Sequence, residues 1–177
     1  IELGNLYYLG QYMATDIKSA LYYYNKAAEL NNSQAQEIIG MIYYMGTYVP
    51  CDIKKSIYYL TKSANQGNDI SQTMLGYIYT LKDYDSYDIN KSIKYFEMAA
   101  NRNNSIAQHC LGYIYFTGSF NIQDINKGIH YYLLSANQNY AGALFNLGQI
   151  YKEGKYVKKN INKAIEYYTK AADLNFS

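Results

Sequence analysis

The sequence has 177 residues, of which 49% are hydrophobic and 17% charged, and this balance is typical of a folded chain and excludes an intrinsically disordered one. Its formal net charge of +2 combines 16 basic with 14 acidic residues, which is too close to neutral to indicate nucleic-acid binding. No apolar run approaches the roughly 18 residues of a membrane span, so direct membrane insertion is not expected either.

A period of 36 residues runs through the whole chain without slipping. It is marked by a glycine that is followed three positions later by a tyrosine: Gly4 and Tyr7, Gly40 and Tyr43, Gly76 and Tyr79, Gly112 and Tyr115, Gly148 and Tyr151. A second glycine stands six positions after the first in four of the five copies, whereas Lys82 takes its place in the third. Because Ile1 lies inside this pattern, we expect the chain to be part of a longer protein.

Each period predicts two helices in chain order. In the second copy, apolar residues at helical spacing predict a first helix, helix A, from about Gln34 to Met45, which ends in the loop GTYVPC. Asp52 is then expected to accept hydrogen bonds from the first turn of a second helix, helix B. Gly67 follows helix B at a position that needs a left-handed conformation. The equivalents of Asp52 are Asp16, Asp88, Asp124 and Asn160, and those of Gly67 are Asn31, Asn103, Asn139 and Asn175.

Gly112 lies inside a predicted helix A, where glycine costs about 1 kcal/mol relative to alanine. Small residues also recur in helix B, at Gly128 and at the pair Ser135 and Ala136. We therefore expect the two helices to pack closely there. A tyrosine ring should fill the space beside Gly112, and the candidates are Tyr115 on the same helix and Tyr131 across the hairpin.

These motifs resemble the Sel1-like repeat. AQHCLGYIYFTG followed by DINKGIHYYLLSAN has its two glycines, its aspartate cap and its small-residue pair, although tyrosine replaces the usual tryptophan of helix B. The resemblance implies an all-α fold, an α/α superhelix or solenoid of helix-turn-helix repeats, whose A helices line a concave face. It also implies a non-enzymatic adaptor that binds another protein. The single repeat domain would have units at approximately 1–33 (truncated), 34–69, 70–105, 106–141 and 142–177.

The binding surface is predicted at the positions of helix A that the hairpin contact leaves free, at spacing i, i+4 and i+7. They are rich in aromatic residues and poor in charge, which suits an extended peptide or a partner helix. An alternative is that these aromatics only pack between neighbouring A helices. The predicted residues are Asn5, Tyr8, Glu37, Met41, Tyr44, Thr73, Tyr77, Thr80, His109, Tyr113, Phe116, Phe145, Gln149 and Lys152.

No catalytic, cofactor or metal site is predicted. His109 and His130 lie on different helices and have no ligand partner at a suitable spacing, so surface positions are expected for both. Cys51 and Cys110 belong to units two repeats apart, which at about 10 Å between helices puts them beyond disulfide reach. Two free thiols favour a reducing, cytoplasmic compartment, although the sequence does not establish the localisation.

Three functions remain open on these grounds. The first is a scaffold that binds a peptide or helix, and the second is a small-molecule binder or hydrolase resembling the β-lactam-binding members of the family. The third is a structural spacer. Since an uncapped solenoid end exposes an apolar face, we also expect either further repeats or self-association through an end.

Overall fold

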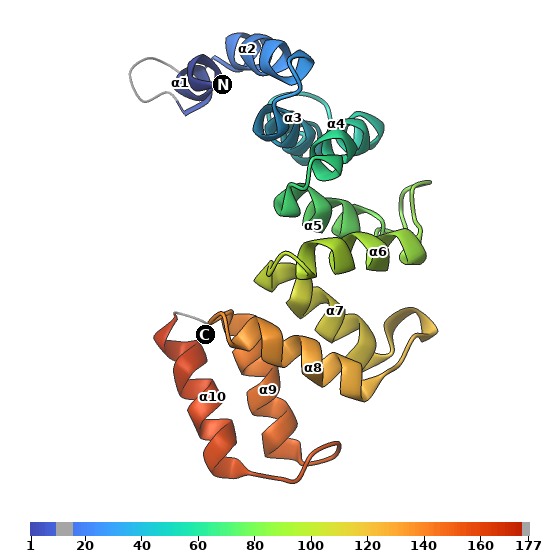
Figure 1. The fold of residues 1–177 in the computed structure, drawn as a ribbon, viewed down its shortest axis with the longest axis vertical. Coiled ribbons are helices and arrows are strands. Elements are labelled where there is room, and N and C mark those ends of the chain that lie inside the picture. The colour runs from blue at the N-terminus through green and yellow to red at the C-terminus, as the bar shows by residue number, and fades with distance from the viewer. Residues whose placement is uncertain (10–15, 175–177) are drawn as a thin grey trace. The chain divides into compact units, whose positions relative to one another are not determined.

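The computed structural model describes residues 1–9 and 16–174, and its secondary structure is helical throughout this part of the chain (Figure 1). The elements in chain order are α1 (Glu2–Leu9), α2 (Ile17–Glu29), α3 (Ser33–Met45), α4 (Ile53–Asn65), α5 (Asp69–Ile78), α6 (Ile89–Ala100), α7 (Ser105–Thr117), the 3-10 helix η1 (Ser119–Asn121), α8 (Ile125–Ala136), α9 (Ala141–Glu153) and α10 (Ile161–Asp173). Odd-numbered α-helices correspond to helix A and even-numbered ones to helix B.

The chain forms two compact units, residues 1–87 and 88–177. In the first, α1 packs on α2, α2 on α3, α3 on α4 and α4 on α5. In the second, α6 to α10 pack in the same sequential manner, and α9 and α10 form the antiparallel hairpin at the red end of Figure 1. Within each unit, every helix therefore packs on its neighbours in the sequence, as expected for stacked helical hairpins.

The predicted caps of helix B are confirmed. Each cap side chain accepts a hydrogen bond from the backbone N–H three residues later, for example Asp52 Oδ1 from Lys55 N at 2.9 Å and Asn160 Oδ1 from Lys163 N at 2.9 Å. The same bond is made by Asp16, Asp88 and Asp124. The expected left-handed residues also have positive φ angles, at Asn31, Gly67, Asn103 and Asn139, whereas Asn175 lies outside the described residues.

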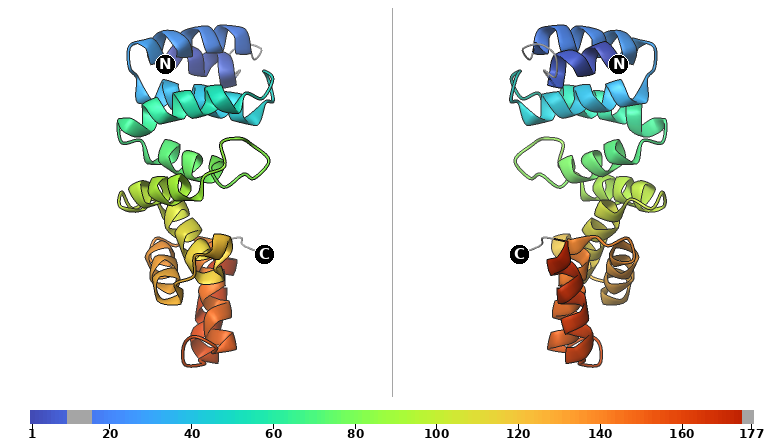
Figure 2. Two further views of the ribbon diagram at one scale, coloured as in Figure 1. Left: turned by 90° about the vertical axis from the view of Figure 1, so that its right-hand side faces the viewer. Right: turned by 90° about the vertical axis from the view of Figure 1, so that its left-hand side faces the viewer.

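The third copy differs where Lys82 replaces the second glycine. The equivalent residues Gly46, Gly118 and Gly154 end α3, α7 and α9 at φ values of 65°, 72° and 70°. Glycine adopts this left-handed conformation without the steric cost that lysine incurs. Helix α5 instead ends at Ile78 after 10 residues, compared with 13 in the other three helices. The longer segment that follows it is visible as a loop in Figure 2.

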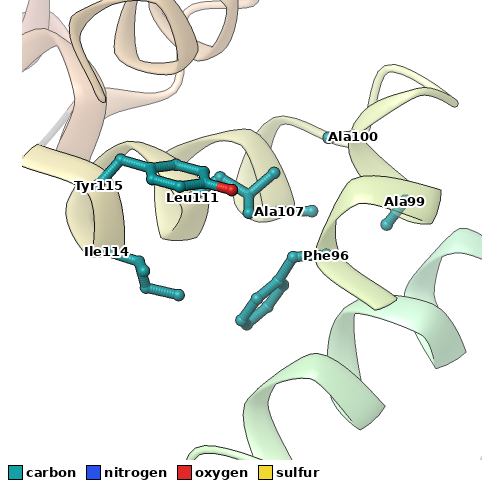
Figure 3. Packing of buried hydrophobic residues seen from close by; sticks show 7 residues of the cluster. All are labelled: Phe96, Ala99, Ala100, Ala107, Leu111, Ile114 and Tyr115. Carbon is teal, nitrogen blue, oxygen red and sulfur yellow. The ribbon is translucent and has the colours of Figure 1, made fainter. Parts of the chain in front are cut away.

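The hydrophobic core joins helix B of one hairpin to helix A of the next. In the second unit, Phe96 of α6 packs with Leu111 and Ile114 of α7, and these side chains converge between the two helices in Figure 3. A second cluster brings Tyr132 of α8 against Leu147 of α9. In the first unit, Tyr24 of α2 and Ile39 of α3 belong to one cluster in the same way. In these three places, helix B of one hairpin is thus stabilised by helix A of the hairpin that follows it.

The close approach predicted at Gly112 is present, but the prediction of its neighbour was wrong. A Cβ atom on Gly112 would lie 2.6 Å from Cδ1 of Tyr132, so Tyr132, and neither Tyr115 nor Tyr131, fills the space beside the glycine. Tyr115 instead stacks on Tyr131, with ring centroids 6.0 Å apart and an angle of 8° between the planes. Since Tyr131 and Tyr132 are adjacent on a helix, they point in directions about 100° apart, and only one of them faces the glycine.

Candidate partner-binding surface

In the first unit, the predicted surface residues lie on α1, α3 and α5, except Thr80, which follows the end of α5. Tyr44 of α3 and Tyr77 of α5 meet edge to face with their ring centroids 6.4 Å apart, yet Tyr77 is 48% exposed. Tyr8 of α1 meets Tyr48 in the same manner at 6.0 Å, and Met41 is half-buried. Neighbouring aromatics therefore do pack together, but Tyr77 retains a large accessible area.

The polar residues predicted in this unit are mostly engaged within the protein. Asn68 Nδ2 donates to Glu37 Oε2 at 2.6 Å, and burial raises the pKa of the Glu37 carboxyl. Thr80 Oγ1 donates to the carbonyl of Tyr77. Asn5 Oδ1 accepts from the hydroxyl of Tyr24.

Thr73 does not belong to an accessible surface. It is only 8% exposed, and its hydroxyl donates to the carbonyl of Asp69 one turn earlier. Threonine satisfies its polar group locally in this way and can be buried in a helix.

In the second unit, helices α7 and α9 border a hollow of about 150 Å³. Its lining is partly aromatic and partly polar, and the residues are Tyr113, Phe116, Thr117, Tyr132, Asn146, Gln149, Ile150 and Glu153. Tyr113 is 53% exposed, and Gln149 is exposed as well. Three of the predicted residues, Tyr113, Phe116 and Gln149, are thus brought together in one place.

His109 contacts two residues that line this hollow, Tyr132 and Asn146. Its ring lies between those of Tyr132 and Tyr140, at centroid distances of 5.7 and 5.0 Å, and its Nε2 is 3.0 Å from Nδ2 of Asn146. Burial lowers the pKa of His109, which favours the neutral ring that can accept a hydrogen bond from the Asn146 amide. His109 is thus only partly exposed, whereas His130 is exposed as expected.

Phe116 and the other two predicted residues of this unit, Phe145 and Lys152, have different surroundings. Phe116 meets Tyr156 edge to face at 5.4 Å, and Phe145 packs against Tyr168 with ring centroids 5.6 Å apart. Lys152 is exposed.

Sequence reasoning missed part of the lining. Thr117, Asn146 and Glu153 each follow a predicted residue by one position, because the exposed arc of helix A is wider than a single i, i+4, i+7 stripe. A search for polar residues beside the aromatic stripe would have found these three. Tyr132 was not predicted as part of the surface, because it lies on a helix B and the prediction covered only positions of helix A.

Three other features of the described chain bear on its function: possible metal ligands, the cysteines and possible membrane-spanning helices. Within residues 1–9 and 16–174, no group of three His, Cys, Asp or Glu side chains is arranged to hold a metal ion. Cys51 and Cys110 are free thiols, as expected, and burial raises the pKa of Cys110 to about 11. In that same part of the chain, none of the helices combines the length and apolar character that crossing a membrane requires.

Comparison with known proteins agrees with this architecture. The sequence model of the Sel1 repeat matches residues 1–32, 33–68, 70–104, 105–140 and 141–176. The chain belongs to the Sel1 repeat family. None of the curated protein sequences matches it significantly. Its fold is accordingly an all-α solenoid of Sel1 repeats, and the resemblance proposed from the sequence is confirmed.

Two solved structures are similar over nearly the whole chain. A Sel1 repeat protein from Oxalobacter formigenes is 30% identical with a TM-score of 0.88, and the match covers 98% of this chain and 71% of that one. The protein c5321, a protective antigen of uropathogenic Escherichia coli, is also 30% identical, with a TM-score of 0.85. That match covers 98% of this chain but 37% of c5321, so the present chain spans little more than a third of that protein.

A third structure shares the fold alone. The immunity protein Pa5087 from Pseudomonas aeruginosa is 23% identical, with a TM-score of 0.64.

Sel1 repeat proteins generally mediate protein–protein interactions and are in general non-catalytic scaffolds.

Proposed function

We propose that this Sel1 repeat chain is a non-enzymatic scaffold that binds an extended peptide or a helix of another protein on the exposed face of its A helices. The observation that supports this most directly is the hollow between α7 and α9. It combines aromatic side chains with amide and carboxylate groups, and three of its lining residues, Tyr113, Phe116 and Gln149, stand at positions that the helix-A pattern predicts.

The size of the hollow favours a side chain of a larger partner over a separate small molecule. Pockets for small molecules usually enclose roughly 300 to 1,000 Å³, whereas this one holds about 150 Å³. Phe116 and Tyr132 offer apolar contact to one inserted side chain. An aromatic anchor of this kind typically dominates the binding energy of a protein interface.

The polar residues of the hollow can form hydrogen bonds with a bound peptide. Asn146 is held by His109, and Gln149 projects from the next turn of α9. Such amides are able to pair with the main chain of an extended peptide, while Glu153 can accept from an N–H group or attract a cation. The arrangement therefore suits a peptide that places one apolar side chain between polar contacts.

The experiment selects binding peptides on the immobilised 177-residue chain by display and measures their affinities by calorimetry. Tyr113→Ala should weaken binding about tenfold, corresponding to about 1.4 kcal/mol, because it removes an exposed aromatic contact. Tyr58→Ala is the matched control, since Tyr58 of α4 is 57% exposed but lies on a helix B. The affinity of the Tyr58→Ala chain should stay within about twofold of the wild-type affinity. Such a change in binding free energy is well below the roughly 1.4 kcal/mol of a tenfold change.

The thermal unfolding of both variants should resemble that of the wild type, because both side chains are exposed. Equal affinities for the Tyr113→Ala and wild-type chains would contradict the proposal. Tyr77→Ala, tested in parallel, shows whether the helix-A face of the first unit contributes to the same peptide.

A further inference from the structure

The basic residues of this chain are concentrated in its second unit. Residues 88–177 contain 10 basic and 6 acidic residues, whereas residues 1–87 contain 6 basic and 8 acidic ones. Half of those 10 lie between residues 152 and 163, in the sequence KEGKYVKKNINK, which has a single acidic residue, Glu153. Positive charge is therefore in excess at the end of α9 and in the turn that follows it, although the whole chain is nearly neutral.

The turn after α9 does not need these lysines for its own structure. It begins with a left-handed glycine, Gly154, and is closed by a hydrogen bond from Asn160 N to the carbonyl of Tyr151 at 2.9 Å. The turns after α3 and α7 are closed by the equivalent hydrogen bonds at 3.0 and 2.9 Å, and their sequences GTYVPCD and GSFNIQD contain no lysine or arginine. Cations near the C-terminus of a helix are stabilising, but the same turn forms without them.

The lysines of this turn, Lys155, Lys158 and Lys159, are all exposed. The residues at the same repeat positions in the second copy are exposed too, although the third copy follows them: Thr47, Pro50 and Cys51. A following copy therefore does not by itself cover these positions. The ammonium group of Lys155 lies 4.9 Å from the centre of the Tyr156 ring, and within residues 1–9 and 16–174 neither Lys158 nor Lys159 forms an ion pair with a carboxylate.

This basic turn borders the hollow of the second unit. Phe116, which lines the hollow, meets Tyr156 of the turn edge to face with ring centroids 5.4 Å apart. A Cβ atom on Gly154 would clash with Lys159, so the turn folds back tightly against the end of α9. Since an extended chain advances about 3.3 Å per residue, a peptide with one side chain in the hollow would reach the turn within about two residues.

We propose that the peptide bound in this hollow carries acidic residues about two positions from its apolar anchor, and that Lys155, Lys158 and Lys159 bind them. This rests on the proposed function, because it specifies the charge of the same peptide. Clustered, exposed ammonium groups attract carboxylates, speed the encounter and orient the partner. Glu153, the single acidic residue of the segment, then accepts from N–H groups of the peptide main chain.

The test uses the tightest-binding peptide from the display selection, together with an analogue in which every Asp and Glu is replaced by Asn and Gln. Calorimetry on the 177-residue chain at about 0.1 M salt should find the analogue weaker by about tenfold or more. At about 1 M salt the difference should fall below about threefold, because salt screens exposed charges.

Charge reversal shows whether the lysines of the turn are responsible. The double variant Lys158→Glu with Lys159→Glu should bind the acidic peptide about tenfold more weakly or worse, and the neutral analogue within about twofold of the wild type. The matched control is Lys94→Glu with Arg102→Glu, which changes the net charge equally at two exposed positions of the second unit, on α6 and just after it. It should leave both affinities within about twofold, and circular dichroism should show the same helix content for all variants.

The outcomes separate this proposal from the one on which it rests. Neutral or basic peptides as the tightest binders, or an unchanged affinity of the Lys158 and Lys159 double variant for the acidic peptide, would overturn the acidic preference and leave the peptide site standing. A selection that yields no binding peptide overturns both. A single-stranded RNA is the second anionic probe: if it binds through these lysines more tightly than any acidic peptide, the turn is a nucleic-acid contact and the proposal fails.

Discussion

Single residues in this protein have roles that depend on which neighbour they contact. Tyr131 and Tyr132 are adjacent and identical, yet Tyr131 stacks on Tyr115 while Tyr132 covers Gly112 and lines the hollow. Lys127 also contacts Tyr115. Its ammonium group lies 2.7 Å from the Tyr115 hydroxyl and 4.1 Å from the centre of the Tyr115 ring. Lys163 repeats this contact with Tyr151. The repeated tyrosines thus contribute both packing and a polar group.

Substitution of Gly112 tests how closely α7 packs on α8. Gly112→Ala should gain about 1 kcal/mol of helix propensity, but its methyl group would lie 2.6 Å from the Tyr132 ring. Overpacking of this kind usually costs about 1 to 3 kcal/mol, so we expect a net loss in the free energy of unfolding, measured by urea denaturation. Gln149→Ala, at an exposed position of α9, should change it by less than about 0.5 kcal/mol. A more stable Gly112→Ala protein would show that the ring moves aside freely.

At the level of elements, the helix ends follow from local sequence. A cap needs one side-chain acceptor and one N–H three residues later, and both belong to the same short segment. The early end of α5 has an equally local cause in Lys82. The caps of α3, α5 and α7 by Asn32, Asn68 and Asn104 were not predicted, although each side chain accepts from the backbone three residues on. Tyr140 interrupts that series before α9, where no side-chain cap forms.

The aspartate caps make stability depend on pH. Hydrogen bonds from the Ser19 side chain lower the pKa of Asp16, and the backbone N–H groups of Lys55 and Lys91 lower those of Asp52 and Asp88. Because these folded-state pKa values lie below the ordinary value of 3.8, the caps stabilise fully above that pH. Their contribution is lost as the pH falls through the lower folded-state values.

Replacing Asp16, Asp52 and Asp88 by asparagine keeps a cap acceptor but removes its titration. The triple variant should lose less stability than the wild type as the pH falls from about 4 to about 2, as measured by thermal unfolding. Asn160 already caps α10 in this way and serves as the natural precedent. Identical pH profiles for the two proteins would contradict the assigned role of the carboxylates.

At the level of the whole molecule, the 36-residue period does not reveal that the chain forms two compact units. The period continues unchanged across residue 87, and the nearest departure from it is Lys82 with the loop that follows α5. Stability in a repeat array is a sum of terms for each repeat and each contact between neighbours, so distant parts can unfold separately.

Core truncations in the two units should therefore have separable effects. Leu147 and Leu75 are both 0% exposed and lie at the same repeat position, in residues 88–177 and 1–87 respectively. Substitution of either by alanine should cost about 3 kcal/mol. Hydrogen exchange followed by mass spectrometry should show the larger loss of protection within residues 88–177 for Leu147→Ala and within 1–87 for Leu75→Ala. Equal losses in both units would indicate one cooperative transition.

The amino-acid sequence alone determined the repeat, the two helices of each period, the caps of helix B and the stacking of consecutive hairpins. These features depend on hydrogen bonds within a few residues and on which face of a helix is apolar, and a periodic sequence displays both. Only the tertiary structure decided that Tyr132 covers Gly112, that Thr73 is buried and that His109 contacts Asn146. Those outcomes depend on how neighbouring helices fill the space between them, and that requires the positions of side chains far apart in the sequence.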